Sequence, residues 1–376
     1  MAQGLGIKQV GYIDVPGGGQ IIVENGIAYV GHMKSPNGTS IIDVRDPRNP
    51  KVLATLGMPQ GTHSHKVRVF GDIMIINQES NHNDDRTPPA DFTGGFNVYD
   101  VSTPSRPREI ARWTTDGGRG VHRFDFDGRY AYMSATQDGY VGNIILIMDF
   151  QDPAHPREVG RWWMPGQWIA GGEKPTWEKS AHRCHHPLRM GNRLYAGYWQ
   201  GGFVIIDIED MSKPKFISGI DWHPPYVCPS HTALPIPFDI LGRRYLVVAD
   251  EDVFRQETDP AAFMWVVDIT DEKHPTVVSS YQVEGIEGRP TPKNTGCHQP
   301  CEKVVGTEIP FAWFAQGLRI IDIKNPHTPR EVAWYMPDPA PGQSRASSND
   351  ITVDDRGLLY LLDRVHGVTI LERDWG

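Results

Sequence analysis

The sequence predicts an all-β protein, a single-domain seven-bladed β-propeller that spans residues 1–376. Three observations predict this fold: a strand–turn–strand phrase recurs along the chain, a hairpin phrase precedes its copies, and the two ends of the chain complement each other. The 39 glycines and 31 prolines agree with a protein of strands and turns, because both residue types disfavour helix interiors.

The strand–turn–strand phrase is an apolar, β-branched run that ends in Asp, followed by a turn with Pro and a second alternating run. Asp and Pro are typical of tight turns, and the alternation is typical of half-buried strands. One copy reads VIIDIEDMSKPKFISGI. The copies lie at residues 40–56, 96–113, 146–162, 204–220, 265–281 and 319–335.

The hairpin phrase is an alternating run, a turn that usually contains Gly, and an apolar run. Residues 65–77, HKVRVFGDIMIIN, are one example, and residues 122–135 and 186–199 follow the same pattern. Two hairpins give a four-stranded sheet, which must stack on its neighbours to bury both faces. Units of roughly 45–65 residues have the size of propeller blades.

The two chain ends predict how the ring closes. The last unit, residues 349–376, ends after its third strand, whereas residues 7–18 match an outer strand and have no blade before them. We therefore expect the N-terminal segment to supply the fourth strand of the last blade. Such closure removes exposed sheet edges.

With its IIDI core and following Pro, the repeated strand pair resembles the LVIVD-repeat β-propeller proteins over nearly the whole chain. The resemblance implies the fold. It implies no particular function, because propellers host unrelated activities.

Aligning the innermost strands places one polar residue at an equivalent position in every blade, and in five blades this residue is histidine. Innermost strands line the central channel, and neutral imidazole is the commonest ligand of transition metals. We therefore predict a divalent metal, iron first and then copper, zinc or manganese, although a ring of hydrogen-bonding histidines is the structural alternative. The predicted metal ligands are His65, His122, His185, His231 and His298, and the other two blades carry Gln20 and Asn349.

Such a channel is similar in architecture to those of other histidine-rich, metal-binding propellers. These are the carotenoid-cleaving oxygenases, the oligogalacturonate lyases and the methanethiol oxidase (selenium-binding) family. The likeness implies a metal site in the channel and does not extend to their full motifs.

Long loops are predicted on one face, beside the histidines: residues 163–184, 222–230, 284–297 and 337–348 before inner strands, and 79–95 and 251–263 after second strands. Long loops on a rigid scaffold usually carry function. The candidates for acid–base or other catalytic roles are His63, His186, Tyr198 and Arg364. Those for substrate binding are Arg183, Trp199, His182, Gln20 and Asn349, and those for orienting the histidines are Glu79, Glu251 and Gln316. For each of these residues, the alternative to a functional role is that of an ordinary loop residue, either solvated or hydrogen-bonded locally.

Two cysteines adjoin the histidine positions, and a thiolate–imidazole zinc site is conceivable there. Neighbours along a strand point to opposite faces, however, so residues next to an inward histidine should point away from the channel. We therefore expect Cys184 and Cys297 to be packed thiols.

The net charge of −9 and the absence of a Lys/Arg run exclude a nucleic-acid or anionic-membrane binder. The N-terminus lacks the basic and apolar segments of a signal peptide, so a cytoplasmic protein is expected. The predicted function is a non-haem oxidoreductase acting on a small organic substrate, aromatic or carboxylated. A metal-assisted lyase or hydrolase and a non-catalytic interaction scaffold are the alternatives, and the oligomeric state is left open.

Overall fold

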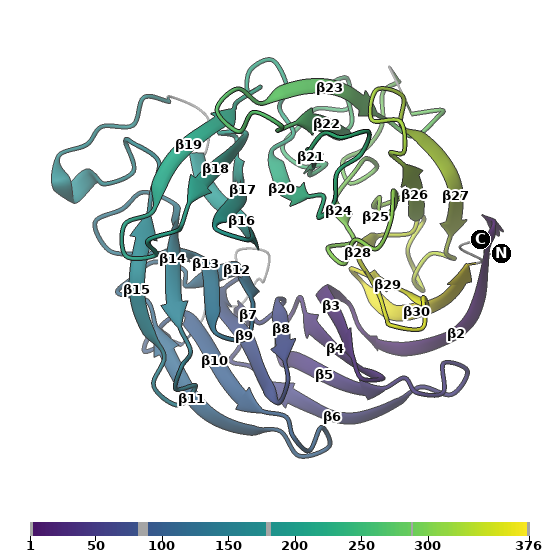
Figure 1. The fold of residues 1–376 in the computed structure, drawn as a ribbon. Helices are drawn as coiled ribbons and strands as arrows, with labels where there is room; N and C mark the ends of the chain where they lie inside the picture. The colour runs from purple at the N-terminus through teal and green to yellow at the C-terminus, as the bar shows by residue number, and fades with distance from the viewer. Residues whose placement is uncertain (1–2, 82–88, 178–181, 287–288, 374–376) are drawn as a thin grey trace.

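The structure, a computed structural model, describes residues 3–81, 89–177, 182–286 and 289–373. In this part of the chain, antiparallel strands form six sheets, and the pairing of Trp199 with Ser230 joins two blades in the largest of them. The sheets thus make seven blades, which are arranged around a central axis (Figure 1). The predicted β-propeller is therefore confirmed. Residues 82–88, 178–181 and 287–288, which belong to loops predicted to be long, lie outside the described residues.

The blades are numbered along the chain, and their strands are given from the channel outwards. Blade 1 consists of β3 (Gly18–Glu24), β4 (Ile27–His32), β5 (Asn37–Asp43) and β6 (Lys51–Gly57). Blade 2 consists of β7 (Thr62–His63) with β8 (Val67–Phe70), β9 (Ile73–Ser80), β10 (Gly95–Asp100) and β11 (Arg108–Thr114). Blade 3 consists of β12 (Val121–Phe126), β13 (Tyr130–Thr136), β14 (Asn143–Asp149) and β15 (Arg157–Trp162).

Blades 4 to 7 follow the same plan. Blade 4 consists of β16 (His182–Met190), β17 (Arg193–Trp199), β18 (Phe203–Asp207) and β19 (Lys215–Ile220), and blade 5 of β20 (Ser230–Pro235), β21 (Tyr245–Asp250), β22 (Met264–Asp268) and β23 (Thr276–Tyr281). Blade 6 consists of β24 (Gln299–Pro300), β25 (Glu308–Ala312), β26 (Leu318–Asp322) and β27 (Arg330–Met336). Blade 7 consists of β28 (Ser348–Val353), β29 (Leu359–Asp363), β30 (His366–Arg373) and β2 (Ile7–Pro16).

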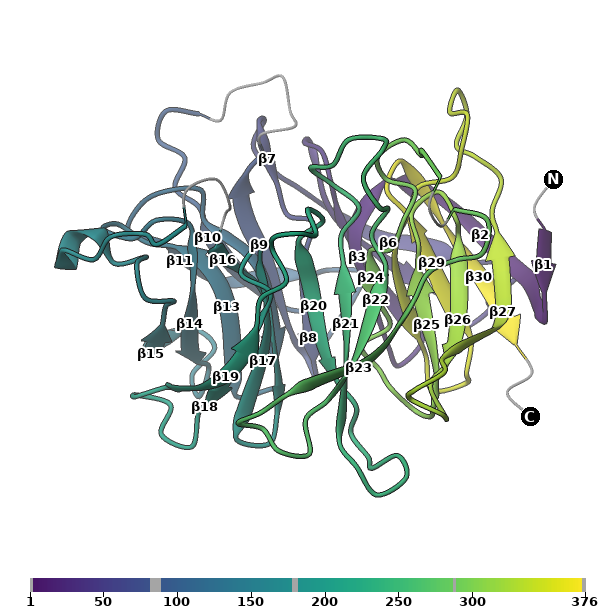
Figure 2. The ribbon, with the colours of Figure 1, turned by 90° about the horizontal axis from the view of Figure 1, so that it is seen from above.

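The ring closes as the sequence predicts. Strand β2 is the outermost strand of blade 7 and pairs with β30, from Ile7 opposite Arg373 to Pro16 opposite His366. Strand β1 (Gln3–Leu5), which the sequence does not predict, then adds to the outer edge of β27 in blade 6 (Figure 2). The two ends of the described chain are thus held side by side in the ring.

Alternation along the repeated strands builds the core between the blades. In β18, Val204 and Ile206 pack in an apolar cluster with blade 3, whereas Phe203 and Ile205 pack in a cluster with blade 5. Successive side chains of a strand point to opposite faces, so a continuous apolar run covers both neighbours of a blade. This explains why the phrase reads VIID or IIDI rather than polar–apolar.

Helix is limited in the described residues to the one-turn 3-10 helix η1 (Ile169–Gly171). No helix there is long and apolar enough to cross a membrane.

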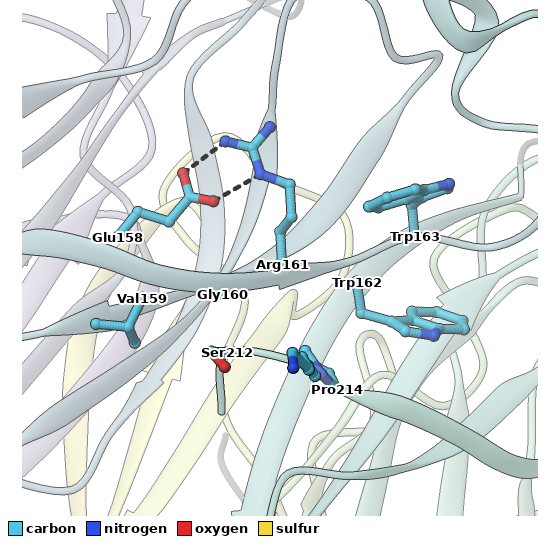
Figure 3. Close-up of a pocket in the computed structure, with 9 residues that line it drawn as sticks. Glu158, Val159, Gly160, Arg161, Trp162, Trp163, Ser212 and Pro214 are labelled. Atoms are coloured by element: carbon cyan, nitrogen blue, oxygen red, sulfur yellow. Dashed lines mark hydrogen bonds and ion pairs between the residues drawn. The ribbon is translucent and has the colours of Figure 1, made fainter. Parts of the chain in front are cut away.

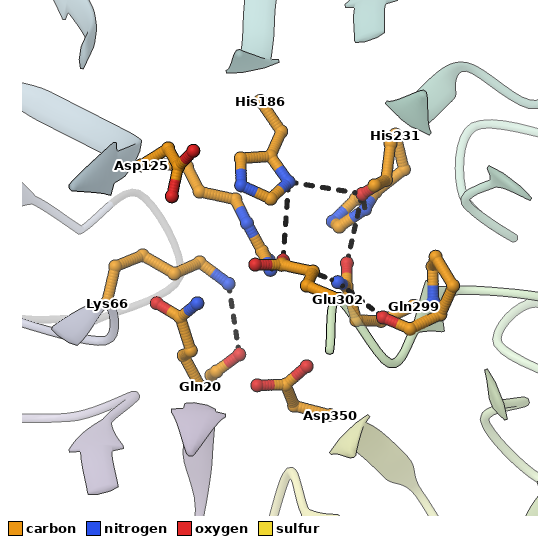
Figure 4. A network of polar contacts seen from close by, with 12 residues as sticks. Gln20, Lys66, Asp125, His186, His231, Gln299, Glu302 and Asp350 are labelled. Carbon is orange, nitrogen blue, oxygen red and sulfur yellow. Dashed lines mark hydrogen bonds and ion pairs between the residues drawn. The ribbon is translucent and has the colours of Figure 1, made fainter. Parts of the chain in front are cut away.

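The inner strands share an irregularity at the predicted histidine position. Their register slips beside this position in β3, β12, β16, β20 and β28, and in blade 2 the inner strand is interrupted between β7 and β8. Seen edge-on, β7 and β8 lie toward opposite faces of the ring (Figure 2). A bulge sets two consecutive residues opposite one partner, so it breaks the alternation of faces. The residue after a ring position can therefore also face the channel, as Lys66, His186 and Asp350 do (Figure 4).

The residue before the ring position behaves as predicted. Cys184 and Cys297 are fully buried free thiols that pack in apolar clusters between blades. Burial raises the pKa of both thiols, which disfavours the thiolate.

Candidate metal centre

Five histidines from five consecutive blades form an arc around the channel. The ring centroids of successive members lie 5.0, 4.6, 4.1 and 4.4 Å apart. The structure thus brings together the five predicted ligands, which are His65, His122, His185, His231 and His298. Blades 1 and 7 complete the circle with Gln20 and Asn349, and both side chains are buried.

Three of these imidazoles have the same hydrogen-bonding pattern at Nδ1. His122 Nδ1 lies 2.8 Å from the Glu79 carboxylate, and His185 Nδ1 lies 3.1 Å from the carbonyl oxygen of His231. His298 Nδ1 lies 2.6 Å from the carbonyl oxygen of Asn349. These partners accept hydrogen bonds, so Nδ1 carries the proton and Nε2 presents its lone pair to the channel.

His231 reaches the same state through a longer chain of hydrogen bonds. The Thr232 hydroxyl donates to Oε1 of Gln299 at 3.0 Å, and the Gln299 amide donates to Glu302 at 2.8 Å. Thr232 Oγ1 must therefore accept the bond from His231 Nδ1, 2.7 Å away. Nε2 of His231 is the fourth lone pair.

Two of these lone pairs point at each other. His122 Nε2 and His185 Nε2 lie 2.8 Å apart, although both rings already carry their proton on Nδ1. Burial lowers the pKa of His122 to about 4 and that of His185 well below its ordinary value, so a second proton is disfavoured on either ring. Two neutral imidazoles in this arrangement fit a shared metal ion, whose bonds to imidazole nitrogen are about 2.0–2.1 Å long.

His65 differs from the other four. The side-chain amide of Asn77 accepts from the Lys66 backbone N–H and donates to the Val121 carbonyl, so its orientation is fixed. Its Nδ2 lies 3.4 Å from Nδ1 of His65, whose ring also stacks on His63 at 3.9 Å. A donor facing Nδ1 favours the proton on Nε2, so His65 presents an N–H to the channel.

Glu79 lies behind the histidines. It is fully buried and accepts from His63 and His122, each at 2.8 Å, while Arg119 lies 3.3 Å from its other oxygen. Burial opposes ionisation, but His122 and Arg119 hold the pKa of Glu79 well below its ordinary value. It therefore stays ionised and fixes the tautomer of His122.

Glu251, in contrast, lies among the ligand atoms. Its Oε1 is 3.6 Å from Nε2 of His298, and it forms a group with His185 and His231 whose ligand atoms lie within 4.8 Å of one another. Burial raises the pKa of this carboxyl. His63, His65 and Glu79 form a second such group.

A polar layer lies beneath the histidines and was not predicted (Figure 4). At its centre Glu302 accepts from Arg68, from Arg123 at 2.6 Å and from Gln299, and it lies 3.5 Å from Nδ1 of His186. Lys66 and Asp350 directly follow ring positions, and Gln20 is itself the ring residue of blade 1. All three side chains also belong to this layer.

The polar layer separates the histidines from the opposite mouth of the channel. A cavity of about 460 Å³ lies on that side, and Arg68, Asp125 and Glu302 are among its lining residues. None of the five ring histidines lines it. The histidine ring therefore faces the other mouth.

Three predicted substrate or catalytic residues lie beside the ring. Trp199 stacks on His185 at 4.6 Å, and the Arg183 guanidinium lies over this indole at 4.3 Å. Arg364 donates to the side chain of Asn349 at 3.2 Å and lies 4.0 Å from Glu251. Gln20 Oε1 accepts from the backbone N–H of Val67, in the polar layer.

Other predicted residues lie elsewhere. Tyr198 is fully buried in the core between blades 3 and 4 and its hydroxyl donates to Gln167, because the left-handed φ of 57° at Trp199 turns the indole rather than the phenol toward the ring. His182 stacks on Trp177 at 4.5 Å, away from the ring. Gln316 lies in the turn after β25, where its carbonyl accepts from Arg319, and His186 lies in the polar layer. These placements do not support the roles predicted for Tyr198, His182, His186 and Gln316.

A large surface hollow, about 560 Å³ in volume, lies away from the ring. Its lining comes from the outer strand β15 and the turn before β19 and includes Trp162, Trp163 and Pro214 (Figure 3). Its charged pair, Glu158 and Arg161, is joined by hydrogen bonds of 2.6 and 2.7 Å. No charged group of this pair is left to bind a ligand.

The hydrogen bond from His122 to Glu79 gives a first prediction. Replacing Glu79 with Gln removes the charge that fixes the imidazole, and loss of such a partner typically weakens metal binding 10- to 100-fold. We expect that loss in competition with a chromophoric chelator. Glu109→Gln, which alters a carboxylate in outer strand β11 that bonds Tyr99, is the matched control. Equal metal affinity in both variants would contradict the assignment of Glu79.

Comparison with known proteins finds the repeat and the fold. The LVIVD repeat model matches residues 90–115, 190–221 and 311–337, which cover strands of blades 2, 4 and 6. The chain thus contains LVIVD repeats. The sequence has no match among curated proteins.

Several solved propellers are similar to this chain. A hypothetical selenium-binding protein from Sulfolobus tokodaii aligns with a TM-score of 0.60 and 12% identity over 89% of this chain and 82% of its own. The WD40 propeller domain of Doa1 gives 0.58 and 10% over 98% of both chains. A streptogramin B lyase gives 0.52 and 15% over 98% and 97%. At these identities the likeness shows the fold alone.

Proposed function

We propose that the protein is a metal-dependent enzyme, a non-haem oxidoreductase that acts on a small organic substrate. The observation that carries this proposal is the 2.8 Å separation of two imidazole nitrogens that both present lone pairs. The residues that would hold the metal are His122, His185, His231 and His298. When bound there, the ion would supply Lewis acidity and redox chemistry.

The chemistry of the donors is compatible with redox metals, because imidazole binds iron and copper as well as zinc and nickel. Imidazole suits iron and copper, and four neutral ligands leave a divalent ion its full charge and room for dioxygen or a substrate. The protein's own residues then have two tasks: Glu79 and Thr232 hold the tautomers, and the polar layer occupies the channel toward the opposite mouth. All four cysteines are buried free thiols, which agrees with a cytoplasmic location and favours iron over copper.

Glu251 favours a second candidate, a metal-assisted lyase or hydrolase. Burial raises the pKa of this carboxyl, which lies 3.6 Å from Nε2 of His298. A carboxyl with a raised pKa beside a metal is suited to moving a proton on a substrate. In this reaction the metal would act only as a Lewis acid.

Metal analysis combined with oxygen uptake tests the proposal. Tag-free protein, purified without chelator, is analysed by ICP-MS, and oxygen consumption is followed with ascorbate as reductant. About one iron or copper per chain with protein-dependent oxygen uptake supports the oxidoreductase. Zinc or manganese without uptake supports the lyase or hydrolase. Folded protein that contains no metal and takes none up on reconstitution contradicts both.

A further inference from the structure

We infer that the substrate of this site is a small dicarboxylate, with one carboxylate bound by Arg183 and the other by Arg364. This inference rests on the proposed function, because it names the substrate class of the same site. It is carried by two matching stacks of side chains beside the histidine ring.

Each stack consists of a ring histidine, an aromatic side chain and a guanidinium. His185 stacks on Trp199 with an interplanar angle of 21°, and the guanidinium of Arg183 covers Trp199 at 4.3 Å. His298 stacks on Phe314 at 4.4 Å and 15°, with Arg364 5.9 Å from the phenyl centroid. The two histidines flank His231, so the two guanidiniums belong to opposite sides of this ligand.

The two aromatic rings are presented by the same backbone turn. Trp199 and Phe314 have φ values of 57° and 30°, in the left-handed region that bulky residues avoid. In both turns the preceding residue, Tyr198 or Trp313, donates its N–H to a glycine carbonyl four residues on, at 2.7 and 2.8 Å. Residues in such unfavourable conformations cluster at functional sites, and here the same turn serves two blades.

The guanidinium groups of Arg183 and Arg364 both have N–H donors that could bind a carboxylate. Nη1 of Arg183 is buried and has no hydrogen-bond acceptor among the described residues. Arg364 uses one donor for Asn349. An arginine fork matches a carboxylate in a bidentate manner, and a buried donor without an acceptor is unfavourable.

The charges around the ring favour a substrate with two negative groups. Arg183 and Arg364 contribute two positive charges beside the ring, whereas Arg119 and Glu79 pair with each other at 3.3 Å. Glu251 is the other carboxylate near this rim, and it lies 4.0 Å from Arg364. A divalent ion adds two more positive charges. A monocarboxylate could contact only one of these two guanidiniums, whereas a dicarboxylate could contact both.

Isothermal titration of the metal-loaded full chain with succinate, glutarate and butyrate tests the inference. We expect a dicarboxylate to bind about 10- to 100-fold more tightly than butyrate. Arg183→Gln and Arg364→Gln should each reduce this ratio toward one. Arg108→Gln, which alters an exposed arginine paired with Asp100 in blade 2, should keep it.

Equal affinities for succinate, glutarate and butyrate, or no binding of any of them, would overturn the inference. Where an arginine variant does not fold, the comparison of the three acids on the wild-type chain still decides the question. Metal content is measured on the same samples. Its absence counts against the proposed function, whereas the ratio of affinities decides the substrate class.

Discussion

The double replacement of His122 and His185 with alanine is expected to remove the bound metal, leaving less than about a tenth of the wild-type content by ICP-MS. Loss of a single residue that only supports a ligand typically costs 10- to 100-fold in metal affinity, and here two ligands are lost. The variant keeps a folded chain, because the removed rings face the channel and the apolar clusters between blades remain. The replacement also removes the 2.8 Å contact between the two Nε2 lone pairs, which favours the folded state of the variant.

Exposed histidines provide the matched control. His155 and His274 pair with Asp152 and Asp271 in the outer turns, and their side chains are more than four-fifths exposed. The His155→Ala, His274→Ala variant should bind as much metal as the wild type. A wild-type protein whose metal content equals that of the His122→Ala, His185→Ala variant would show that the ring is structural.

The replacement of Glu302 with glutamine is expected to lower the free energy of unfolding by about 3–5 kcal/mol, measured by urea denaturation. Glutamine has nearly the same shape but no charge, so Arg68 and the fully buried Arg123 lose their shared carboxylate. Removing one partner of a buried ion pair leaves an uncompensated charge in a site of low polarity. The tautomer of His231, held through Thr232 and Gln299, should be disturbed as well.

The pH dependence of stability should also change in the Glu302→Gln variant. Burial opposes ionisation, but Arg68, His186 and Arg123 lower the pKa of Glu302 below its ordinary value of 4.5. The folded state then binds this proton less readily than the unfolded state. The stabilisation is therefore present above about pH 4.5 and is lost as the pH falls through the folded value. The wild type should lose more stability on acidification than the variant.

A surface carboxylate gives the reference for this effect. Glu372 pairs with Lys8 at 3.7 Å, and both side chains are more than half exposed. Glu372→Gln should change stability by less than about 1 kcal/mol, as exposed pairs generally do. A similar small change for Glu302→Gln would show that the polar layer is well hydrated.

The fold could be predicted because its signals are local and repeated. Each copy of the strand pair shows the alternation of two strands and the residues of the turn between them. The truncated last unit indicates how the ring closes. The ring of histidines was found for the same reason: its members hold one position in equivalent strands. Neither inference required knowledge of contacts between distant residues.

The second layer of the channel could not be found in this way. Lys66, Arg123 and His186 directly follow ring histidines, and strict alternation assigns them to the opposite face. A bulge depends on the pairing of two strands, which the pattern within one strand does not state. The recurrence of a charged or polar residue after the ring position offered a signal. Six blades have one there: Lys66, Arg123, His186, Thr232, Gln299 and Asp350.

Trp199 and Tyr198 show how a shift of one residue exchanges two candidates. The strand pattern does not distinguish which aromatic residue ends β17, and the left-handed φ of Trp199 decides it. A signal was present in the sequence: YWQGG at 198–202 and WFAQG at 313–317 both set two aromatic residues shortly before a glycine. Comparison of these two turns would have indicated Trp199 and Phe314 together.

The polar layer around Glu302 determines how substrate can enter the channel and how product can leave it. Because paired charges fill one end of the channel, the substrate and the product of the proposed enzyme must use the same channel opening. The product has to depart before the next reactant can arrive, so the two compete for the same space. Inhibition by accumulated product, relieved by raising the reactant concentration, would then be built into the architecture.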